Sequence, residues 1–275
     1  MNVRIALAQV SAQQDKQKNL QKAVKFMKEA SSKGAKLICF PEMSFDIFFP
    51  QYRAERKYFE LAEKIPGKTV RKFQKEAKEL NIITVFNMYE EDKKGEYYDC
   101  SPVINFDGKI SGKSRMMHIA ELPNYNEKFY YWQGNTGFPV YNGGGFCFGI
   151  AICYDRHYPE QLRALTLNGA DLILVPTATS LPEFKTIWEV EMQAAAVTNQ
   201  VYIAVVNKVG KDDNMTFFGG SFVVNPRGEV IARASYDDDE LLLVDIDLNV
   251  IKETRNILPF LRDRRPEIYS ILCEK

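Results

Sequence analysis

The sequence lacks an excess of either charge, because its 275 residues include 36 basic and 36 acidic side chains. A balanced chain has no overall field that would draw it to nucleic acid or to an anionic membrane surface. No apolar run approaches the ~18 residues of a membrane span. The N-terminus, MNVRIALAQV, is too short and too alternating for a signal peptide. We therefore expect no nucleic-acid partner, no membrane segment and a cytoplasmic location.

Paired cysteines and clustered histidines are also missing. The five cysteines are odd in number, scattered and without CxxC spacing, and the only histidines are His118 and His157. Two histidines without matched cysteine or carboxylate spacing do not make a metal site. These absences predict a reduced protein without a disulfide framework and without a metal site.

The most informative stretch that is present is FCFGIAICYDRHYPE, residues 146–160. Its apolar first half predicts a buried strand, and the strand ends at Cys153, directly before a proline-containing helix start. A strand-to-helix turn can expose a thiol and aim backbone N–H groups at a developing oxyanion. Free cysteine is also among the most buried residue types, so this segment alone is compatible with a core cysteine.

Two carboxylates follow the same pattern and favour a catalytic role. Glu42 follows the predicted buried strand 37–40, and Glu127 lies in an aromatic, proline-interrupted loop. In open α/β sheets, functional groups collect at the carboxyl ends of strands. We therefore expect Glu42, Glu127 and Cys153 to meet.

The chain as a whole alternates strands and helices, with no linker, low-complexity tract or repeat. Apolar spacing predicts helices over 16–33, 159–168 and 188–199. Asp107-Gly108 predicts a tight hairpin between strands at 103–106 and 109–114. This order indicates an α/β fold with a mixed sheet.

The ordered motifs VRIALAQV, FPE, GKSRMMHI, EKFYYWQGNTGF, GIAICYDRHYPE, GADLILVPTA and NPRGEVIA carry a family resemblance. With them the chain resembles the nitrilase superfamily, the carbon–nitrogen hydrolases, over nearly its whole length. The EKFYYWQGNTGF stretch is most similar to the branch of the N-carbamoylputrescine amidases and β-ureidopropionases. The resemblance implies a four-layer αββα sandwich, one domain over residues 1–275, and no cofactor.

The resemblance also assigns roles to individual residues. It places the nucleophile at Cys153, the general base at Glu42 and the supporting carboxylate at Glu127. The backbone N–H of Tyr154 would be one oxyanion donor. The family's triad lysine falls on Met116, where this sequence departs from the pattern.

Met116 has no charge and can neither hold a thiolate nor stabilise a tetrahedral intermediate. Loss of one preorganised oxyanion partner typically costs on the order of 100- to 1,000-fold in turnover. Lys113 lies three residues away, so the period of a strand turns it to the opposite face, and we interpret it as a solvated surface residue. Lys128, Lys185 or a cationic group of the substrate are the other candidates for the missing charge.

Three hypotheses follow from these residues. The first is a thiol hydrolase that cleaves a nonpeptide C–N bond in a small amide or N-carbamoyl compound. The second is a catalytically impaired homologue that serves as a small-molecule binding or regulatory protein, and the third is an engineered replacement of lysine by methionine. By their places on strand-end loops, the candidate walls of the substrate site are Tyr125, Tyr154, Thr177 and Trp188.

The segment of about 250–275 is a polar, proline-containing tail that also carries apolar residues outside any regular core pattern. Members of the family pair into dimers and often exchange such tails, so the resemblance implies a homodimer or a higher homo-oligomer. Docking on another subunit and folding back on the same domain are both compatible with the tail sequence.

Overall fold

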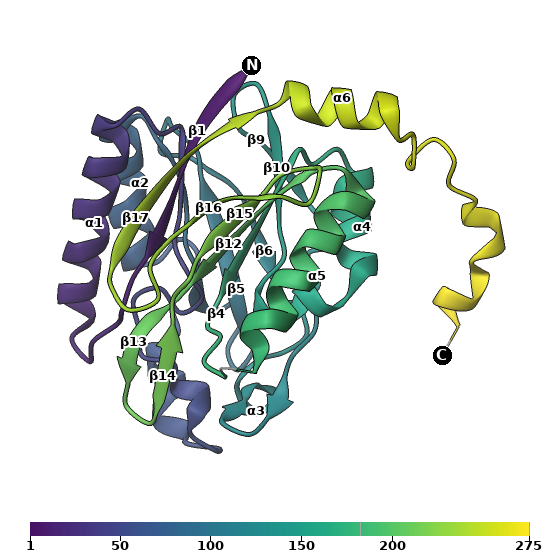
Figure 1. Ribbon diagram of the computed structural model, residues 1–275. Coiled ribbons are helices and arrows are strands. Elements are labelled where there is room, and N and C mark those ends of the chain that lie inside the picture. Colours follow the sequence, from purple (N-terminus) through teal and green to yellow (C-terminus); the bar gives the residue numbers. More distant parts are fainter. Residues whose placement is uncertain (182, 275) are drawn as a thin grey trace.

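Two β-sheets packed face to face form the centre of the molecule, and helices cover both outer faces (Figure 1). The structure is a computed structural model that describes residues 1–181 and 183–274. The layers run helix, sheet, sheet, helix, which confirms the predicted four-layer αββα architecture. In the described part of the chain, no helix is both long and apolar enough to cross a membrane.

The first sheet has the strand order β17-β1-β2-β3-β5-β4, with β6 added beside β5. Strands β1 and β2 are parallel, and β1 pairs with β17 from the far end of the chain in antiparallel register. The strands are β1 (Asn2–Gln9), β2 (Leu37–Cys39), β3 (Ile83–Val85), β4 (Met88–Glu91), β5 (Tyr97–Ile104), β6 (Ile110–Arg115) and β17 (Glu240–Asp247).

The second sheet has the order β16-β15-β12-β11-β10-β9, with β10, β11 and β12 parallel. Its strands are β9 (Val140–Asn142), β10 (Cys147–Ile150), β11 (Leu172–Thr177), β12 (Tyr202–Asn207), β15 (Phe222–Val224) and β16 (Val230–Arg233). Two small two-stranded sheets complete the fold, formed by β7 (Glu121–Leu122) with β8 (Tyr125–Asn126) and by β13 (Val209–Asp212) with β14 (Met215–Phe218).

Helices α1 and α2 cover the first sheet, and α4 and α5 cover the second. Helix α1 begins where the Asp15 side chain accepts hydrogen bonds from two backbone N–H groups, and α2 ends at Asn81 in the left-handed conformation. The helices are α1 (Lys16–Ser32), α2 (Lys68–Leu80), the short α3 (Glu127–Tyr130), α4 (Pro159–Leu167), α5 (Phe184–Asn199) and α6 (Asn249–Ile257).

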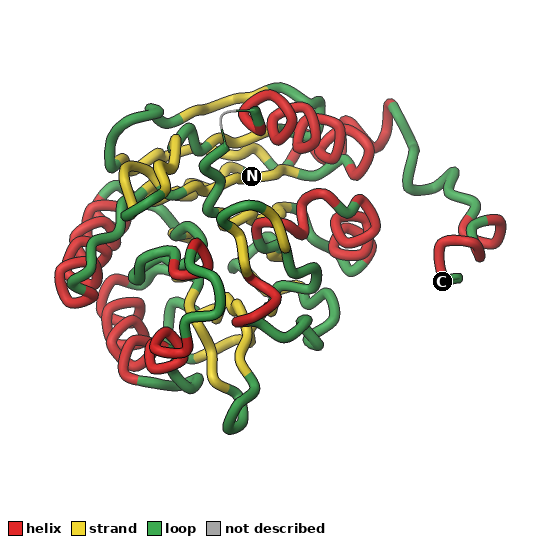
Figure 2. Tube along the Cα trace, turned by 90° about the horizontal axis from the view of Figure 1, so that it is seen from below, coloured by secondary structure: helices red, strands yellow, loops and turns green. Residues whose placement is uncertain are grey.

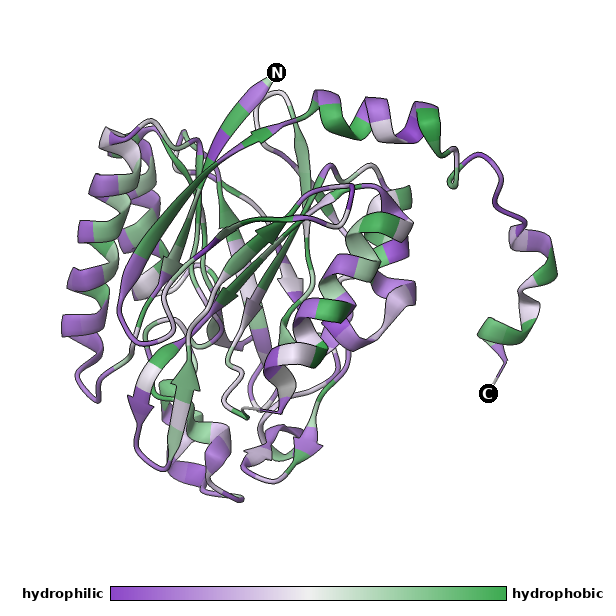
Figure 3. Cartoon of the chain, in the orientation of Figure 1, coloured by the Kyte–Doolittle hydropathy of each residue, from purple (hydrophilic) through white to green (hydrophobic). Residues whose placement is uncertain are grey.

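Hydrophobic side chains lie between the layers. Figure 3 shows apolar colour along the central strands and polar colour on the outer side of α1. The largest apolar cluster lies between the two sheets, and a separate cluster lies under each helical layer. Because both sheets are covered on both faces, strands such as β2 and β11 are buried throughout.

Most of the predicted elements are confirmed. The Asp107-Gly108 hairpin joins β5 to β6, and the helices predicted at 16–33 and 159–168 are α1 and α4 within one residue. The helix predicted from Trp188 begins four residues earlier, at Phe184. The sequence gives no sharp start signal there, because the residue that precedes the helix, Glu183, forms no side-chain cap.

The chain beyond α6 projects past the sheets and helices in both views (Figures 1 and 2). It contains two short 3-10 turns, Pro266–Ile268 and Ser270–Cys273. Several of its large apolar side chains are exposed, namely Leu258, Phe260, Ile268, Ile271 and Leu272. The described part of the tail therefore does not bury its apolar groups in its own domain.

Candidate active site

The thiol of Cys153 lies three residues beyond the end of β10, at the first residue of a 3-10 turn that spans Cys153–His157. Its backbone has φ of 45°, in the left-handed region that a non-glycine residue seldom adopts. Such strain is often found at functional sites. The Thr177 hydroxyl, at the end of β11, donates to the sulfur at 3.3 Å. The sulfur is thus held at the carboxyl ends of two neighbouring parallel strands.

The carboxyl group of Glu42 reaches the same point from the first sheet, just beyond β2. Glu42 is completely buried, and in the described chain neither of its oxygens has a well-formed hydrogen bond. The groups that approach them are the Cys153 thiol, the Asp99 carboxyl and the backbone amide of Ala178. Burial and the negative charge of Glu127 raise the pKa of Glu42 to about 8. The site therefore places an acid-base group against a thiol.

Two more buried carboxyl groups belong to this cluster. Asp99 on β5 accepts a hydrogen bond from the Asn87 amide, and Glu127 at the start of α3 accepts one from the Ala120 N–H at 3.1 Å. Burial and the charge of Glu42 raise the pKa of Asp99 well above its usual value. Burial and the charge of Asp99 raise the pKa of Glu127 to about 8. These carboxyl groups therefore compete for protons as a cluster.

Carboxylates could also bind a metal. Among residues 1–181 and 183–274, however, no group of three or more His, Cys, Asp or Glu side chains is placed to hold a metal ion.

Met116 lies directly after β6 and is completely buried between the two sheets. The Asp155 carboxylate fixes this segment, because it accepts hydrogen bonds from the N–H groups of Met117 at 3.1 Å, His118 at 3.0 Å and Ile152 at 3.1 Å. One buried carboxylate thus ties the end of β6 to the Cys153 turn. An uncharged thioether occupies the position at which the resemblance predicts a lysine.

Lys113 is not the solvated residue that we expected from the sequence. It does lie on the face opposite Met116, as the period of two predicts. Its ammonium forms ion pairs with Glu90 and Asp92, and the side chain is only 28% exposed. The same Glu90 accepts two hydrogen bonds from Arg115. The prediction of free solvation was wrong because the carboxylates of Glu90 and Asp92, supplied from across β5 in the same sheet, pair with the ammonium and leave it half-buried.

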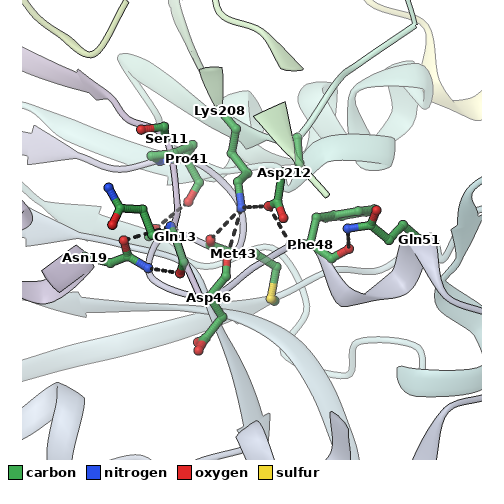
Figure 4. Close-up of polar contacts among 12 residues, drawn as sticks. Ser11, Gln13, Asn19, Pro41, Met43, Asp46, Phe48, Gln51, Lys208 and Asp212 are labelled. Atoms are coloured by element: carbon green, nitrogen blue, oxygen red, sulfur yellow. Dashed lines mark hydrogen bonds and ion pairs between the residues drawn. The ribbon is translucent and has the colours of Figure 1, made fainter. Parts of the chain in front are cut away.

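Lys208 fixes the segment that carries Glu42 (Figure 4). It follows β12 in the second sheet, and its buried ammonium donates to the backbone oxygens of Met43 at 3.3 Å and Asp46 at 2.9 Å. It also pairs with Asp212 at 3.1 Å, and the Asp212 carboxylate accepts the Phe48 N–H at 2.8 Å. One cation and its partner therefore hold the loop after Glu42 against the second sheet.

A cavity of about 220 Å³ opens over the thiol. Among its lining residues are Cys153, Glu127 and Arg156, and the predicted wall residues Tyr125 and Tyr154 are there too. The remaining lining residues are Ala120, Leu122, His157, Ala178 and Thr179. A cavity of this size fits a small substrate rather than a polymer.

The other two predicted wall residues lie elsewhere. Thr177 is buried beneath the cavity, where it contacts the sulfur. Trp188 is 1% exposed and packs edge-on against Phe218 and Phe222, in the apolar cluster between α5 and the second sheet. Its assignment to the wall was wrong, because a tryptophan on an amphipathic helix serves the core equally well.

The sequence analysis did not identify Asp99, Arg156 or Lys208. Asp99 lies in a strand that pairs on both sides, and only the tertiary fold brings it to Glu42. Lys208 is distant in sequence from the loop that it binds. Arg156 did give a signal, since it lies three residues after Cys153 in a turn, where the two side chains can meet.

Three comparisons with known proteins bear on this geometry. The family model for carbon–nitrogen hydrolases matches residues 4–256. The N-carbamoylputrescine amidase of Oryza sativa subsp. japonica is 33% identical, over 98% of this chain and 94% of its own. A carbon–nitrogen hydrolase structure from Helicobacter pylori G27 superposes with a TM-score of 0.95 at 28% identity, covering 100% of this chain and 99% of that one.

A third similar protein is a mutant of the amidase from Nesterenkonia sp. AN1. Its TM-score is 0.84 at 25% identity, with 98% of this chain and 95% of that chain covered. In that structure the acetamide moiety of fluoroacetamide is covalently added at the active site cysteine.

Proposed function

Because the chain belongs to the carbon–nitrogen hydrolase family, we propose that it hydrolyses a nonpeptide C–N bond in a small amide or N-carbamoyl compound, with Cys153 as nucleophile. The observation that carries the proposal is the approach of the Glu42 carboxyl to the Cys153 thiol beneath a cavity of about 220 Å³. A nucleophile and a base within reach of each other are the minimum for covalent catalysis by a thiol.

In the first half of the reaction, ionised Glu42 accepts the proton of Cys153 as the sulfur attacks the substrate carbonyl carbon. The backbone N–H of Tyr154 is our candidate donor to the resulting oxyanion. Glu42 then returns the proton to the leaving nitrogen, and ammonia or an amine departs from a thioester on Cys153.

In the second half, Glu42 takes a proton from water as the water attacks the thioester carbonyl. The sulfur leaves as thiolate and recovers the proton. An N-carbamoyl substrate would yield carbon dioxide and ammonia along with its amine. No step calls for a cofactor.

The substrate class follows from the relatives and from the size of the cavity. One relative is an N-carbamoylputrescine amidase and another is an amidase. Aromatic side chains, Tyr125 and Tyr154, line part of the cavity, while Glu127 and Arg156 give it a carboxyl group and a guanidinium group. We propose a small ureido compound or aliphatic amide as substrate.

Buried, uncharged Met116 is the observation that favours a second candidate function. Without a cation at that position, a homologue could keep its cavity and bind a small molecule without turning it over. The retained thiol, base and supporting carboxyl group favour the hydrolase.

The test is an ammonia-release assay with a panel of N-carbamoyl amines, N-carbamoyl β-amino acids and aliphatic amides. We expect at least one compound to release ammonia, and Cys153→Ala to abolish the release while leaving the fold intact. Met116→Lys serves as the comparison for the missing charge. A wild-type protein that stays silent on the whole panel, and gains activity only with Met116→Lys, would refute the hydrolase function for this chain and favour the binding or inactivated alternative.

A further inference from the structure

The guanidinium group of Arg156 lies beside the sulfur of Cys153. Its Nη1 donates to the Cys153 carbonyl oxygen at 2.8 Å and approaches the Thr177 hydroxyl at 3.4 Å and the Cys153 sulfur at 3.7 Å. The short bond to the carbonyl oxygen fixes Nη1 within the 3-10 turn that begins at Cys153. The side chain is only 5% exposed and lines the cavity.

Other buried cations near the site are neutralised by carboxylates. Arg115 pairs with Glu90 at 2.8 Å, and Lys208 pairs with Asp212 at 3.1 Å. No such ion pair is found for Arg156 in the described part of the chain; its nearest recorded partners are the groups around the thiol. Arginine stays protonated at any working pH, so a positive charge without a salt bridge among the described residues faces the sulfur. The Glu127 carboxyl lines the same cavity and is near enough for the charge of Arg156 to lower its pKa.

The Cys153 thiol needs a nearby positive charge to favour its ionised form. Burial raises the pKa of the Cys153 thiol well above its usual value, and the negative charges of Glu42 and Glu127 raise it further. The positive charge of Arg156 acts in the opposite direction and lowers it. Met116, buried in the same apolar cluster as Cys153, contributes no charge.

We propose that Arg156 is a catalytic residue whose guanidinium group stabilises the Cys153 thiolate. When Glu42 accepts the proton of the thiol, the new negative charge on sulfur is paired at once with Nη1. Arg156 itself neither gains nor loses a proton. This inference rests on the proposed role of Cys153 as nucleophile, but the charge effect on the thiol can be measured without any substrate.

The experiment measures the rate at which iodoacetamide alkylates Cys153 as a function of pH, with peptide mass mapping to separate this cysteine from the other four. The variants are Arg156→Gln and Arg156→Met, which remove the charge, and Arg156→Lys, which keeps it. Arg163→Gln is the matched control, because Arg163 lies on α4 and donates to the Thr198 carbonyl oxygen at 2.8 Å, away from the thiol. Circular dichroism and thermal melting identify which uncharged variants remain folded.

An opposite charge this close typically lowers a pKa by about one to three units. We therefore expect the midpoint of alkylation to rise by about one unit or more in a folded uncharged variant. Arg156→Lys should stay near the wild-type midpoint, and Arg163→Gln should match it.

An unchanged midpoint in Arg156→Gln or Arg156→Met, with the fold retained, would overturn the proposal. So would a shift in Arg156→Lys as large as that in the uncharged variants, because shape rather than charge would then be responsible. Persistence of ammonia release in Cys153→Ala would refute the proposed nucleophile, and the alkylation midpoints would still report on Arg156.

Discussion

Glu42 must lose its own proton before it can accept one from Cys153. Its buried setting raises its pKa to about 8. Below that pH most of the carboxyl is protonated and cannot act as the base; above it, the carboxylate is available. We therefore predict that kcat/KM rises with pH, with an apparent pKa near 8 for the coupled cluster.

The measurement is kcat/KM from ammonia release across the neutral and alkaline range, on a substrate without an ionisable group of its own. If kcat/KM no longer changes with pH well below pH 7, Glu42 is already ionised there, and its pKa is lower than its burial predicts. A rate that falls with rising pH would contradict the assignment of Glu42 as the base.

Asp99 gives a second prediction at the scale of single residues. Its carboxyl approaches that of Glu42, and two facing carboxyl groups are stable only when a proton lies between them. Because the pKa of Asp99 is raised well above its usual value, Asp99 keeps its proton, and Glu42 is the carboxyl of the pair that ionises as the pH rises past about 8. Asp99 then acts as a neutral acid that positions Glu42.

Asp99→Asn keeps a neutral donor of nearly the same shape. We therefore predict that the midpoint of the pH profile moves by less than about half a unit, which is smaller than the shift that a nearby charge typically causes. Asp99→Leu removes the donor and should move the midpoint to higher pH. A large fall of the midpoint in Asp99→Asn would show instead that Asp99 is ionised in the wild-type protein.

At the scale of single residues, the sequence identifies site residues that follow a strand. It does not identify those that the tertiary fold brings in from distant segments. Cys153 and Glu42 could be placed together because strand ends and family resemblance both indicate them, and the resemblance adds Glu127. Asp99 and Lys208 could not, because their roles depend on contacts between distant segments. The solvation of Lys113 could not be predicted either, because its partners Glu90 and Asp92 come from a different part of the sequence.

At the scale of elements, the buried pair of Lys208 and Asp212 joins the two sheets at the loop after Glu42. Removing one member leaves the other charge buried and unpaired, which costs roughly 3–5 kcal/mol. We predict a loss of that size in the free energy of unfolding of Lys208→Met, measured by urea denaturation. Activity should fall as well, because the loop after Glu42 loses its anchor.

Arg4→Met is the control for the Lys208 prediction, because Arg4 pairs with Asp245 at the surface, with 44% of the arginine side chain exposed. We expect it to cost far less, since exposed ion pairs contribute little. A stability of Lys208→Met equal to that of Arg4→Met would show that the loop is held by other contacts.

Elements themselves were largely readable from the sequence. The buried strands and the helix α1 followed from apolar periodicity, and the β5–β6 hairpin followed from Asp107-Gly108. The predicted start of helix α5 was too late because no capping residue marks the true start. The division of strands between two sheets came from the resemblance, since an alternating pattern alone does not distinguish one sheet from two.

At the scale of the whole molecule, the tail after α6 exposes large apolar side chains, among them Ile271 at 67% and Leu272 at 62%. Exposed apolar groups on a projecting segment are suited to burial against a second copy of the chain. We propose that the tail contributes to a homodimer or a higher homo-oligomer.

We predict that size-exclusion chromatography with light scattering shows the full chain to be oligomeric. A variant that ends at Ile257 should have fewer subunits. Ile268→Ser combined with Leu272→Ser keeps the tail length and should weaken assembly in the same direction. A truncated chain with an unchanged subunit number would show that assembly uses another face.

The central claim is that Cys153 forms a covalent thioester with the carbonyl carbon of an amide or N-carbamoyl substrate. The most direct test is rapid acid quenching of the wild-type protein during turnover of an active compound, followed by peptide mass mapping. We predict a transient mass increase, equal to the acyl or carbamoyl group, on the peptide that contains Cys153, with none in Cys153→Ala. Product formation without any modified Cys153 at the earliest times, or an adduct on a different residue, would contradict the account.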